Sequence, residues 1–304
     1  MKHRVGVDLG GTKIEICVLD MSGNILYRER VPTPKNDYAR ILNALKDLVN
    51  TAQSLIGFDE KIGVGIGIPG AVSPRTGLIK NSNTLCLIGK PLAKDLELLL
   101  HRPVRLANDA NCFALSEATD GVAQIFNSVF GVILGTGCGG GLVFEKKIIV
   151  GGNAIAGEWG HCALAWPTEE EWKREACYCG KRLCNELYLS GTGIEKEYFL
   201  KSQKKKTVQE IHEAFHQKDA AAMQTLELFF DRIARALSQV INVFDPEAIV
   251  LGGGVSNMQE IYSEVPARLQ QYAFSDGIST RLLQAKYGDS SGVRGAAWLF
   301  NSMA

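Results

Sequence analysis

Three cysteines and one histidine form the most specific group of potential ligands in the chain. Cys177, Cys179 and Cys184 occur within the eight-residue stretch CYCGKRLC, and His161 stands sixteen residues before the first of them. Three thiolates and one imidazole are a complete tetrahedral ligand set for zinc and leave no position for water. The group therefore predicts a structural zinc site. Unliganded cysteines are the alternative, because the chain also uses cysteine as a small apolar residue at five other positions.

An asparagine and an aspartate follow a short strand-like run in the segment RLANDANC. Ligands of open α/β sheets bind at the carboxyl ends of strands, so Asp109 is placed to act as a general base toward a hydroxyl group. Asn108 would then hydrogen-bond the same ligand. The alternative is that these residues cap the following helix by accepting a free backbone N–H. The residues by themselves leave both possibilities open.

A glycine turn near the N-terminus, DLGGTK, joins two strand-like runs. Gly10 and Gly11 permit a backbone conformation whose N–H groups face an anion, and Thr12 adds a hydroxyl group. Asp8 could approach a magnesium ion or its waters. The segment is neither a Walker loop nor a dinucleotide fingerprint, because no GKS/T ending and no helix follow. A plain hairpin is the alternative for this turn alone.

A second glycine turn, LGTGCGG, has the same character and contains Gly135, Thr136 and Gly137. Two polar glycine turns, each with a threonine, suit a ligand with several phosphates. A glutamate and a histidine three positions apart, Glu158 and His161, could bind adjacent hydroxyls of a polyol. Caps or ion pairs are the alternative for that pair. Zinc at His161 would brace the loop that carries Glu158.

The elements that must position these residues alternate between strands and helices. The segment HRVGVDLGGTKIEICVLDMSGNILYRERVP predicts three strands joined by turns, and YARILNALKDLVNTAQSLI predicts an amphipathic helix. The strand-like runs KIGVGIGIPGAV and VRLAND then alternate with the helical runs PLAKDLELLL and ANCFALSEATDGV. This order predicts an α/β fold with a mainly parallel sheet.

The order of elements repeats from about residue 128. SVFGVILGTGCGGGLVFEKKIIVGG again predicts strand, glycine turn and strand, and PEAIVLGGGV parallels KIGVGIGIPGAV. We expect two similarly wound halves that face one another across a cleft, although α/β chains are often self-similar without duplication. The insertion that carries the cysteines contains TEEEWKREA, predicted as a charged helical face, and LKSQKKKTVQE, predicted as a solvated loop.

Composition limits the kinds of partner. The chain has 304 residues, with 33 Lys and Arg against 33 Asp and Glu, so no large field favours nucleic acid or an anionic membrane. The uncharged run 121–144 contains seven glycines and predicts two strands around a turn, not a membrane span. The N-terminus shows no apolar signal segment. We therefore expect a cytoplasmic protein whose thiols are reduced.

Taken together, these motifs resemble the ROK family of sugar kinases, and within it most closely the bacterial fructokinases (mannofructokinases). The resemblance covers essentially the whole chain. It rests on the joint order of DLGGTK, GIPGAV, LANDAN, LGTGCGGG, AGEWGH, CYCGKRLCNE, SGTG and VLGGGVSN. It implies an actin-like (ribonuclease-H-like) two-domain kinase fold with a ligand cleft between the domains. The expected boundaries are residues 1–117 with 290–304 for a small domain, and 118–289 for a large domain with the zinc-binding insertion.

The resemblance implies ATP-dependent phosphorylation of a free hexose, most closely fructose, at its 6-hydroxyl, with ATP, Mg²⁺ and a structural Zn²⁺. It also implies a homodimer. Carried over by motif, Asp109 is the catalytic base. The residues implied for the hexose are Asn108, Glu158, His161, Glu186 and Gly70. The residues implied for phosphates, magnesium and adenosine are Asp8, Gly10, Gly11, Thr12, Lys13, Gly135, Thr136, Gly137, Gly252, Gly253 and Gly254.

Three departures and several alternatives accompany this resemblance. Leu183 stands where the family commonly has glycine before the last cysteine, Asn185 and Leu187 replace more usual residues, and the loop at Cys86 and Ile88 lacks the expected aromatic and asparagine. The last departure leaves glucose, mannose or an N-acetylhexosamine as alternative substrates. A sugar-binding regulator would need an N-terminal helix-turn-helix, for which the first strand leaves no room. An actin-like ATPase would need no glutamate, histidine and zinc insertion.

Overall fold

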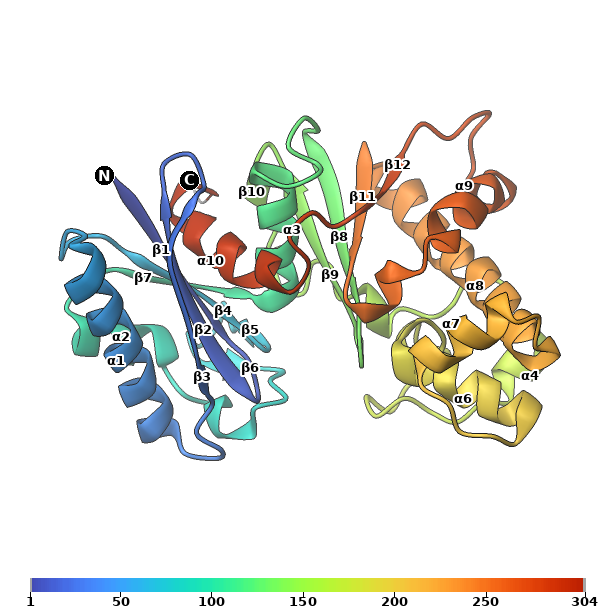
Figure 1. Ribbon diagram of the computed structural model, residues 1–304, viewed down its shortest axis with the longest axis horizontal. Coiled ribbons are helices and arrows are strands. Elements are labelled where there is room, and N and C mark those ends of the chain that lie inside the picture. Colours follow the sequence, from blue (N-terminus) through green and yellow to red (C-terminus); the bar gives the residue numbers. More distant parts are fainter. Residues whose placement is uncertain (1, 303–304) are drawn as a thin grey trace. The chain divides into compact units, whose positions relative to one another are not determined.

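The computed structural model describes residues 2–302 and divides into two compact units (Figure 1). Unit 1 contains residues 2–127, 141–156 and 286–302, and unit 2 contains residues 128–140 and 157–285. Relative to the boundaries expected from the sequence, unit 1 also includes residues 118–127, 141–156 and 286–289.

Unit 1 is built on a five-stranded sheet in the order β3-β2-β1-β4-β7. The first three strands form the predicted antiparallel meander, and β4 and β7 add in parallel. The strand bounds are β1 (His3–Leu9), β2 (Lys13–Asp20), β3 (Ile25–Pro32), β4 (Val64–Ile68) and β7 (Val104–Asn108). A two-stranded ribbon, β5 (Ala71–Val72) and β6 (Ile79–Lys80), and a short 3₁₀ helix, η1 (Leu85–Leu87), follow β4.

Helices cover both faces of this sheet (Figure 1). One face carries α1 (Tyr38–Ile56) and α2 (Leu92–Leu100), and the other carries α10 (Ser291–Ser302), which packs on α3 (Asp109–Thr119). The chain end thus returns to the first unit.

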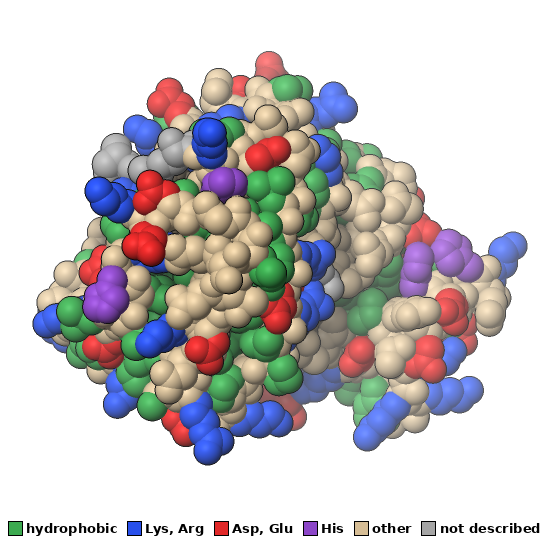
Figure 2. Space-filling model, turned by 60° about the vertical axis from the view of Figure 1, so that its left-hand side comes forward, with side chains coloured by type: hydrophobic (Ala, Val, Ile, Leu, Met, Phe, Trp, Pro, Cys, Tyr) green, Lys and Arg blue, Asp and Glu red, His purple; other side chains and the backbone are tan. Residues whose placement is uncertain are grey.

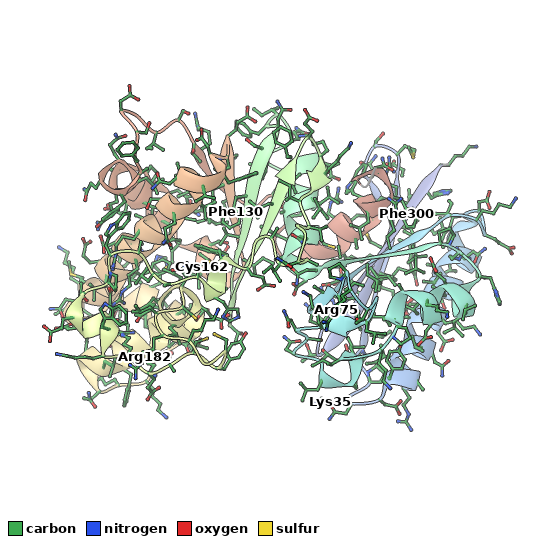
Figure 3. All side chains as sticks on the ribbon, turned by 180° about the vertical axis from the view of Figure 1, so that it is seen from behind. Lys35, Arg75, Phe130, Cys162, Arg182 and Phe300 are labelled. Carbon is green, nitrogen blue, oxygen red and sulfur yellow. The ribbon has the colours of Figure 1, made fainter. Side chains whose placement is uncertain are left out.

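Glycines let α10 approach the sheet closely. A Cβ on Gly65 would lie 1.9 Å from the carbonyl oxygen of Ala296, and one on Gly63 would lie 2.2 Å from the ring of Phe300 (Figure 3).

The second sheet has the same strand order as the first, in keeping with the repeated order of elements that the sequence predicted. Its order is β10-β9-β8-β11-β12, with β8/β11 and β11/β12 parallel and β9/β10 antiparallel. The strand bounds are β8 (Ser128–Leu134), β9 (Cys138–Phe144), β10 (Lys147–Ile148), β11 (Ala248–Gly252) and β12 (Arg281–Gln284). The uncharged run 121–144 therefore forms two strands around a turn. Among residues 2–302, no helix combines the length and apolar character needed to cross a membrane.

The helices of unit 2 assemble around the 25-residue α8 (Ala220–Phe244), against which α9 (Glu260–Tyr272), α6 (Gly191–Ser202), α7 (Val208–His216) and α5 (Glu186–Leu189) pack. Shorter elements are α4 (Glu169–Trp172) and the 3₁₀ helices η2 (Trp159–His161) and η3 (Gly254–Asn257), while η4 (Gly288–Ser290) precedes α10. Basic and acidic side chains are interspersed over the face shown in Figure 2, in keeping with their equal numbers.

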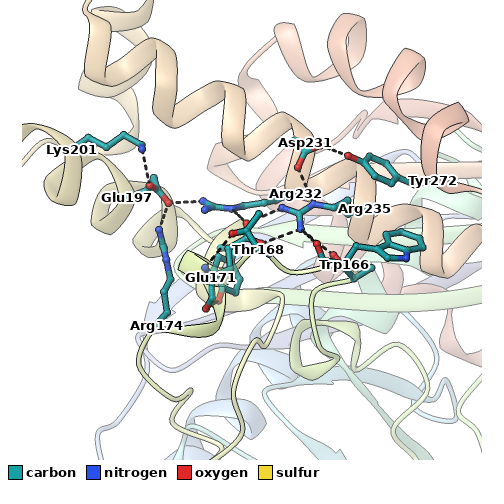
Figure 4. Close-up of polar contacts among 12 residues, drawn as sticks. Trp166, Thr168, Glu171, Arg174, Glu197, Lys201, Asp231, Arg232, Arg235 and Tyr272 are labelled. Atoms are coloured by element: carbon teal, nitrogen blue, oxygen red, sulfur yellow. Dashed lines mark hydrogen bonds and ion pairs between the residues drawn. The ribbon is translucent and has the colours of Figure 1, made fainter.

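The segment TEEEWKREA, predicted as a charged helical face, is helical over α4, and one of its carboxylates is buried. Glu171 is only 2% exposed, because Arg232 and Arg235 of α8 bind its carboxylate (Figure 4). The Arg232 Nε lies 2.7 Å and the Arg235 Nη2 lies 2.8 Å from Oε1 of Glu171. Thr168 caps the helix and donates its backbone N–H to Oε2 at 2.9 Å. Buried ion pairs therefore attach the insertion to α8.

Candidate functional site

Two carboxylates lie at the carboxyl ends of strands in unit 1, as the sequence predicted. Asp8 is the penultimate residue of β1, and Asp109 begins α3 directly after β7. The Asp8 side chain fits between β4 and α10: a Cβ on Gly67 would lie 3.5 Å from its Oδ1, and a Cβ on Gly292 would lie 3.5 Å from its Oδ2. Asp109, in contrast, is exposed.

The pKa of Asp8 is raised from its ordinary value of 3.8 to about 7, and burial is the largest cause. The negative charges of Asp109 and Glu15 also contribute to this rise, while the positive charges of Lys13 and Arg30 partly oppose it. A buried carboxylate beside a second carboxylate favours either a proton or a cation. Since hard oxygen ligands are those that Mg²⁺ prefers, the pair fits a magnesium ion or its coordinated waters.

Asn108 caps the helix that follows it. Its Oδ1 accepts the backbone N–H of Ala110 at 2.9 Å, and its Nδ2 donates to the carbonyl oxygen of Gly70 at 3.2 Å. Oδ1 of Asp109 accepts the same Ala110 N–H at 2.8 Å. The capping alternative is thus present in the structure, and the Asp109 side chain remains exposed while taking part in it.

The first glycine turn, residues 10–12, is braced by its own strands and by a loop of unit 1. The backbone N–H of Gly10 donates to the carbonyl of Lys13 at 2.9 Å, and Thr33 Oγ1 donates to the carbonyl of Gly10 at 2.7 Å. Gly11 and Thr12 are exposed. A Cβ on Gly11 would lie 3.7 Å from Thr84 Oγ1, which is buried without a hydrogen-bond partner among the described residues. Gly11 and Thr12 are therefore the accessible part of this turn.

Gly70 is a position that only glycine fits. Its φ of 110° lies outside the range that other residues adopt, and an added Cβ would lie 2.6 Å from the Lys80 carbonyl oxygen. The loop that contains Cys86 and Ile88 therefore starts directly against the Gly70 backbone, which Asn108 also contacts. Leu85 and Ile88 in this loop are 71% and 47% exposed. The departure noted in the sequence thus lies in the loop that adjoins Gly70.

The second glycine turn, residues 135–137, opens onto a cavity of about 660 Å³ within unit 2. Gly135 and Thr136 line it together with Gly254, so the structure brings together three of the residues predicted for the nucleotide. Gly137, Gly252 and Gly253 are not among its lining residues. The volume falls within the range of about 300–1,000 Å³ that small-molecule pockets occupy.

Most of the remaining cavity wall was missed by the sequence reasoning. It comes from α6, α7 and the segment around η3, and its members are Gly191, Thr192, Glu195, Thr207, Val208, Gln209, His212, Val255, Asn257 and Met258. The SGTG motif gave one usable signal: Ser190 caps α6, Gly191 N donates to the Gly135 carbonyl at 2.7 Å, and Thr192 Oγ1 donates to the Thr136 carbonyl at 3.0 Å. The start of α6 therefore supports the second turn.

Glu186 supports the same turn. Its Oε2 accepts the backbone N–H of Cys138 at 2.9 Å and would lie 2.7 Å from a Cβ on Gly137. Asn185, one of the departures from the family pattern, directly precedes Glu186 and is 1% exposed. Its Nδ2 donates to the Trp159 carbonyl at 2.9 Å. The residues after the last cysteine therefore link the insertion to the second turn and to η2.

The predicted zinc ligands converge within unit 2. The ligand atoms of His161, Cys177, Cys179 and Cys184 all lie within 4.8 Å of one another. Nδ1 of His161 is 3.7 Å from Sγ of Cys177, and Sγ of Cys179 is 3.5 Å from Sγ of Cys184. Tetrahedral zinc with Zn–S bonds of about 2.3 Å places sulfur atoms about 3.8 Å apart. The donor set and its spacing therefore fit zinc.

Leu183, the departure before the last cysteine, lies in a tight turn of the backbone. Leu183 adopts a left-handed conformation with φ of 64°, and its side chain is buried at 5% exposure. Its carbonyl accepts the N–H of Leu164 at 2.7 Å. A residue with a Cβ therefore adopts the conformation that favours glycine, and burial of its side chain offsets a strain of about 1 kcal/mol.

The other ring nitrogen of His161, Nε2, lies 3.0 Å from the hydroxyl group of Tyr178. Glu158 is exposed, and its backbone carbonyl accepts the N–H of His161 at 3.3 Å. Cys162, which follows His161 and is labelled in Figure 3, is also exposed, and among residues 2–302 it belongs to no group of potential metal ligands. Zinc at Nδ1 would fix the orientation of the ring and thereby the loop that carries Glu158.

Comparison with known proteins gives one consistent result. The ROK family model matches residues 4–303. The chain is 42% identical to the N-acetyl-D-glucosamine kinase of Haemophilus influenzae (strain 86-028NP), over 97% of this chain and 98% of that protein. It is 41% identical to the N-acetyl-D-glucosamine kinase of Yersinia pseudotuberculosis serotype IB (strain PB1/+), over 97% of each.

Solved structures agree. The ROK hexokinase of Thermus thermophilus superimposes with a TM-score of 0.86 at 31% identity and covers 98% of this chain and 97% of its own. A ROK family glucokinase from Streptomyces griseus, solved with glucose and AMPPNP, gives a TM-score of 0.77 at 27% identity, with 98% of each chain covered. The similarity extends over the full length in each case.

Proposed function

Because the chain belongs to the ROK family and is an ATP-dependent sugar kinase with the expected actin-like fold, we propose that its hexose is an N-acetylhexosamine, N-acetyl-D-glucosamine first of all. The observation that carries this proposal is the 42% identity, from end to end, to kinases named for that sugar. Fructose, the hexose expected from the sequence, has no support in these comparisons. The N-acetylhexosamine, which the sequence left as an alternative substrate, is better supported.

Asp109 is proposed as the general base. Phosphoryl transfer depends mainly on positioning and charge stabilisation, and a carboxylate that accepts the proton of the attacking hydroxyl adds about 10²–10⁴-fold. The exposed Asp109 side chain would take the proton of the 6-hydroxyl as its oxygen attacks the γ-phosphorus of ATP, and ADP leaves. When bound near Asp8, magnesium would neutralise part of the negative charge of the phosphates.

The cavity of unit 2 is the proposed nucleotide site. Gly135 and Thr136 would approach the phosphates with their backbone N–H groups, and Gly254 would lie near the adenosine. The N-terminal residues of α6, Gly191 and Thr192, also line the cavity, and a helix N-terminus favours phosphate charge. In unit 1, the first glycine turn with Lys13 is proposed to contact the phosphates as well.

Two sets of side chains are proposed to bind the sugar. Asn108 and the Gly70 backbone form one set in unit 1, where they are joined by a hydrogen bond of 3.2 Å. Glu158, His161 and Glu186 form the other set in unit 2. We assign discrimination of the acetamide group to the loop that adjoins Gly70, since exposed Leu85 and Ile88 offer apolar contact for a methyl group.

An assay of ADP release across a panel of sugars tests the substrate. The panel contains N-acetyl-D-glucosamine, N-acetyl-D-mannosamine, glucose, mannose and fructose. We expect kcat/KM for N-acetyl-D-glucosamine to exceed that for each unmodified hexose by about tenfold or more, because one well-recognised substituent contributes about 1–3 kcal/mol. Equal or faster turnover of fructose would refute the proposed substrate, and ADP release without any sugar would favour the ATPase alternative.

A structural zinc ion is proposed for His161, Cys177, Cys179 and Cys184. Metal analysis of the purified protein should give about one zinc per chain at this site. Cys184→Ser should lose that zinc, whereas Cys162→Ser, which changes an exposed cysteine outside the group, should retain it. Zinc-free protein, or loss of zinc in both variants, would contradict the assignment. The homodimer implied by the resemblance stays a prediction, which sedimentation velocity measures.

A further inference from the structure

A second group of potential metal ligands lies in unit 2, apart from the cysteine cluster. His212 and His216 belong to α7, and Glu260 is the first residue of α9. Nε2 of His212 lies 2.8 Å from Oε2 of Glu260, and Nε2 of His216 lies 3.2 Å from its Oε1. The two Nε2 atoms are 3.2 Å apart. Two helices thus direct three ligand atoms to one point.

These separations bring the three atoms close enough to share one metal ion. Tetrahedral zinc with bonds of about 2.0–2.1 Å to nitrogen and oxygen places its ligand atoms about 3.3 Å apart. The three observed separations lie between 2.8 and 3.2 Å. Hydrogen bonds alone satisfy this arrangement less well. If both imidazole rings donated to the carboxylate of Glu260, their two N–H groups would lie close together. A cation satisfies all three atoms at once.

The backbone fixes the directions of these side chains. Residues four apart on a helix lie on the same face, so His212 and His216 point the same way. Thr207 and Glu210 form a capping box at the start of α7, and buried Ile211 and Ala214 hold the opposite face of the helix in place. The histidines therefore need little rearrangement to bind.

The sequence HEAFH matches the His-Glu-x-x-His spacing of zinc proteases, but the glutamate is directed elsewhere. Glu213 is exposed and accepts a hydrogen bond from Nε2 of Gln209, one turn back along the helix, at 3.1 Å. It is outside the group formed with Glu260. The geometry is therefore that of a binding site and does not provide the general base that peptide hydrolysis requires.

We propose that His212, His216 and Glu260 bind one divalent transition-metal ion, such as Zn²⁺, Ni²⁺ or Cu²⁺. Imidazole and carboxylate ligands suit these ions, and the affinity should follow the order Ni²⁺ below Cu²⁺. Three protein ligands leave at least one coordination position for water. The His216 side chain is 57% exposed, so an ion can enter from solvent.

The ion would connect two parts of the cavity wall. His212 lines the 660 Å³ cavity, and Glu260 follows Asn257 and Met258, which also line it. A metal bridge between α7 and α9 would hold these walls at a fixed separation. Anything that binds the cavity should therefore change the affinity for the metal, and the metal should change the affinity of that ligand by the same factor.

Nickel titration of protein that carries one zinc per chain, in the cysteine cluster, tests the second site without use of enzyme activity. Thiolates retain zinc, while a site of two imidazoles and a carboxylate accepts Ni²⁺. Calorimetry in a non-coordinating buffer should show one Ni²⁺ per chain with micromolar affinity. His216→Ala and Glu260→Gln should each weaken binding about tenfold or more, since an absent ligand costs at least what outer-shell changes cost. Glu213→Gln, a carboxylate loss on the same helix, should bind as the wild type does.

The result that overturns the proposal is equal Ni²⁺ affinity in wild-type protein and His216→Ala, or an equal loss in Glu213→Gln. A second measurement does not depend on any variant. The electron paramagnetic resonance spectrum of the wild-type protein with one equivalent of Cu²⁺ should show coupling to two imidazole nitrogens. A spectrum without nitrogen coupling would also overturn it.

Discussion

Two carboxylates, the partly buried Asp8 in unit 1 and the buried Glu171 in unit 2, show opposite electrostatics. Burial and the neighbouring carboxylate of Asp109 raise the pKa of Asp8 to about 7. Burial would likewise raise the pKa of Glu171, but hydrogen bonds from Arg235 and Arg232 lower it to about 2. The Asp8 carboxylate is therefore not neutralised by its neighbours, whereas the Glu171 carboxylate is neutralised by two arginines.

The difference separates a group available for chemistry from one that holds the fold together. A carboxylate bound by two guanidinium groups has no remaining demand for a ligand, and breaking the arrangement leaves buried charges without partners. A carboxylate placed beside another carboxylate is stabilised by a proton or a cation that arrives with substrate. We therefore expect substitutions around Asp8 to change turnover and its metal or pH dependence, and substitutions around Glu171 to change stability.

The largest effect is expected at Asp109. Asp109→Asn retains an oxygen that can accept the Ala110 N–H but removes the basic carboxylate. kcat should fall by about 10²–10⁴-fold because the proton acceptor is lost. Asp47→Asn, an exposed change on α1, is the matched control and should leave kcat unchanged. Steady-state kinetics and nucleotide titration measure both; an unchanged kcat in Asp109→Asn would remove the proposed base.

The stability counterpart is Glu171→Ala. It leaves Arg232 and Arg235 buried without their carboxylate, which should lower the free energy of unfolding by about 3–5 kcal/mol. The exposed neighbour Glu170 provides the control, because Glu170→Ala should change it by less than about 0.5 kcal/mol. Chemical denaturation gives both values. If the two variants unfold alike, the ion pairs of Figure 4 do not stabilise the insertion.

The pH dependence of stability should have opposite signs for the two carboxylates. Asp8 binds more protons in the folded chain than in the unfolded chain, so its contribution to the free energy of unfolding is lost as pH rises from about 4 to about 7. Asp8→Asn should remove that loss. Between pH 4 and pH 8, its free energy of unfolding should therefore rise by about 2 kcal/mol relative to that of the wild type, after allowance for the partial exposure of Asp8.

Glu171 gives the opposite slope. Its pKa is lower in the folded chain than its ordinary value of 4.5, so its contribution is present above that pH and is lost as pH falls toward about 2. Glu171→Gln should therefore flatten the acid side of the stability curve. Denaturation curves from pH 3 to pH 8 measure both slopes, and a common sign for the two variants would contradict the comparison.

The smallest effect is expected in the cavity of unit 2. Gly254 lines the cavity, and a Cβ there would meet open space, so Gly254→Ala places a methyl group where adenosine is proposed to lie. ATP affinity should fall about tenfold, with kcat at saturating ATP largely retained, since one methyl group contributes about 1–3 kcal/mol in a pocket. Gly277→Ala, in an exposed loop with equal space, is the control. Equal ATP affinities would exclude Gly254 from the nucleotide site.

The order of elements and the cluster of His161 with three cysteines could be predicted because their signals lie close together in the sequence. The meander and its repeat follow from strand periodicity interrupted by glycine turns, and the thiolates occur within eight residues. The helix cap at Asn108 was equally visible, but the sequence could not decide between a cap and a ligand. The side-chain oxygen of Asn108 can serve in either role.

The remaining features depend on partners that are distant in sequence. Glu171 and its arginines are 61 and 64 positions apart, so the sequence predicted a charged helical face but not the buried ion pairs. The wall of the cavity combines the second turn with α6, α7 and η3, and only the SGTG motif gave a signal. The histidine spacing on α7 is visible in the sequence, whereas Glu260 lies 48 positions beyond His212.

Identification of the reaction product tests the central claim most directly. Wild-type protein incubated with N-acetyl-D-glucosamine, ATP and Mg²⁺ should form ADP and a sugar phosphate in equal amounts, and phosphorus NMR with carbon coupling should place the phosphate on the 6-oxygen. The Asp109→Asn variant should form neither at a comparable rate. ADP without a matching sugar phosphate, or undiminished product from Asp109→Asn, would contradict the account.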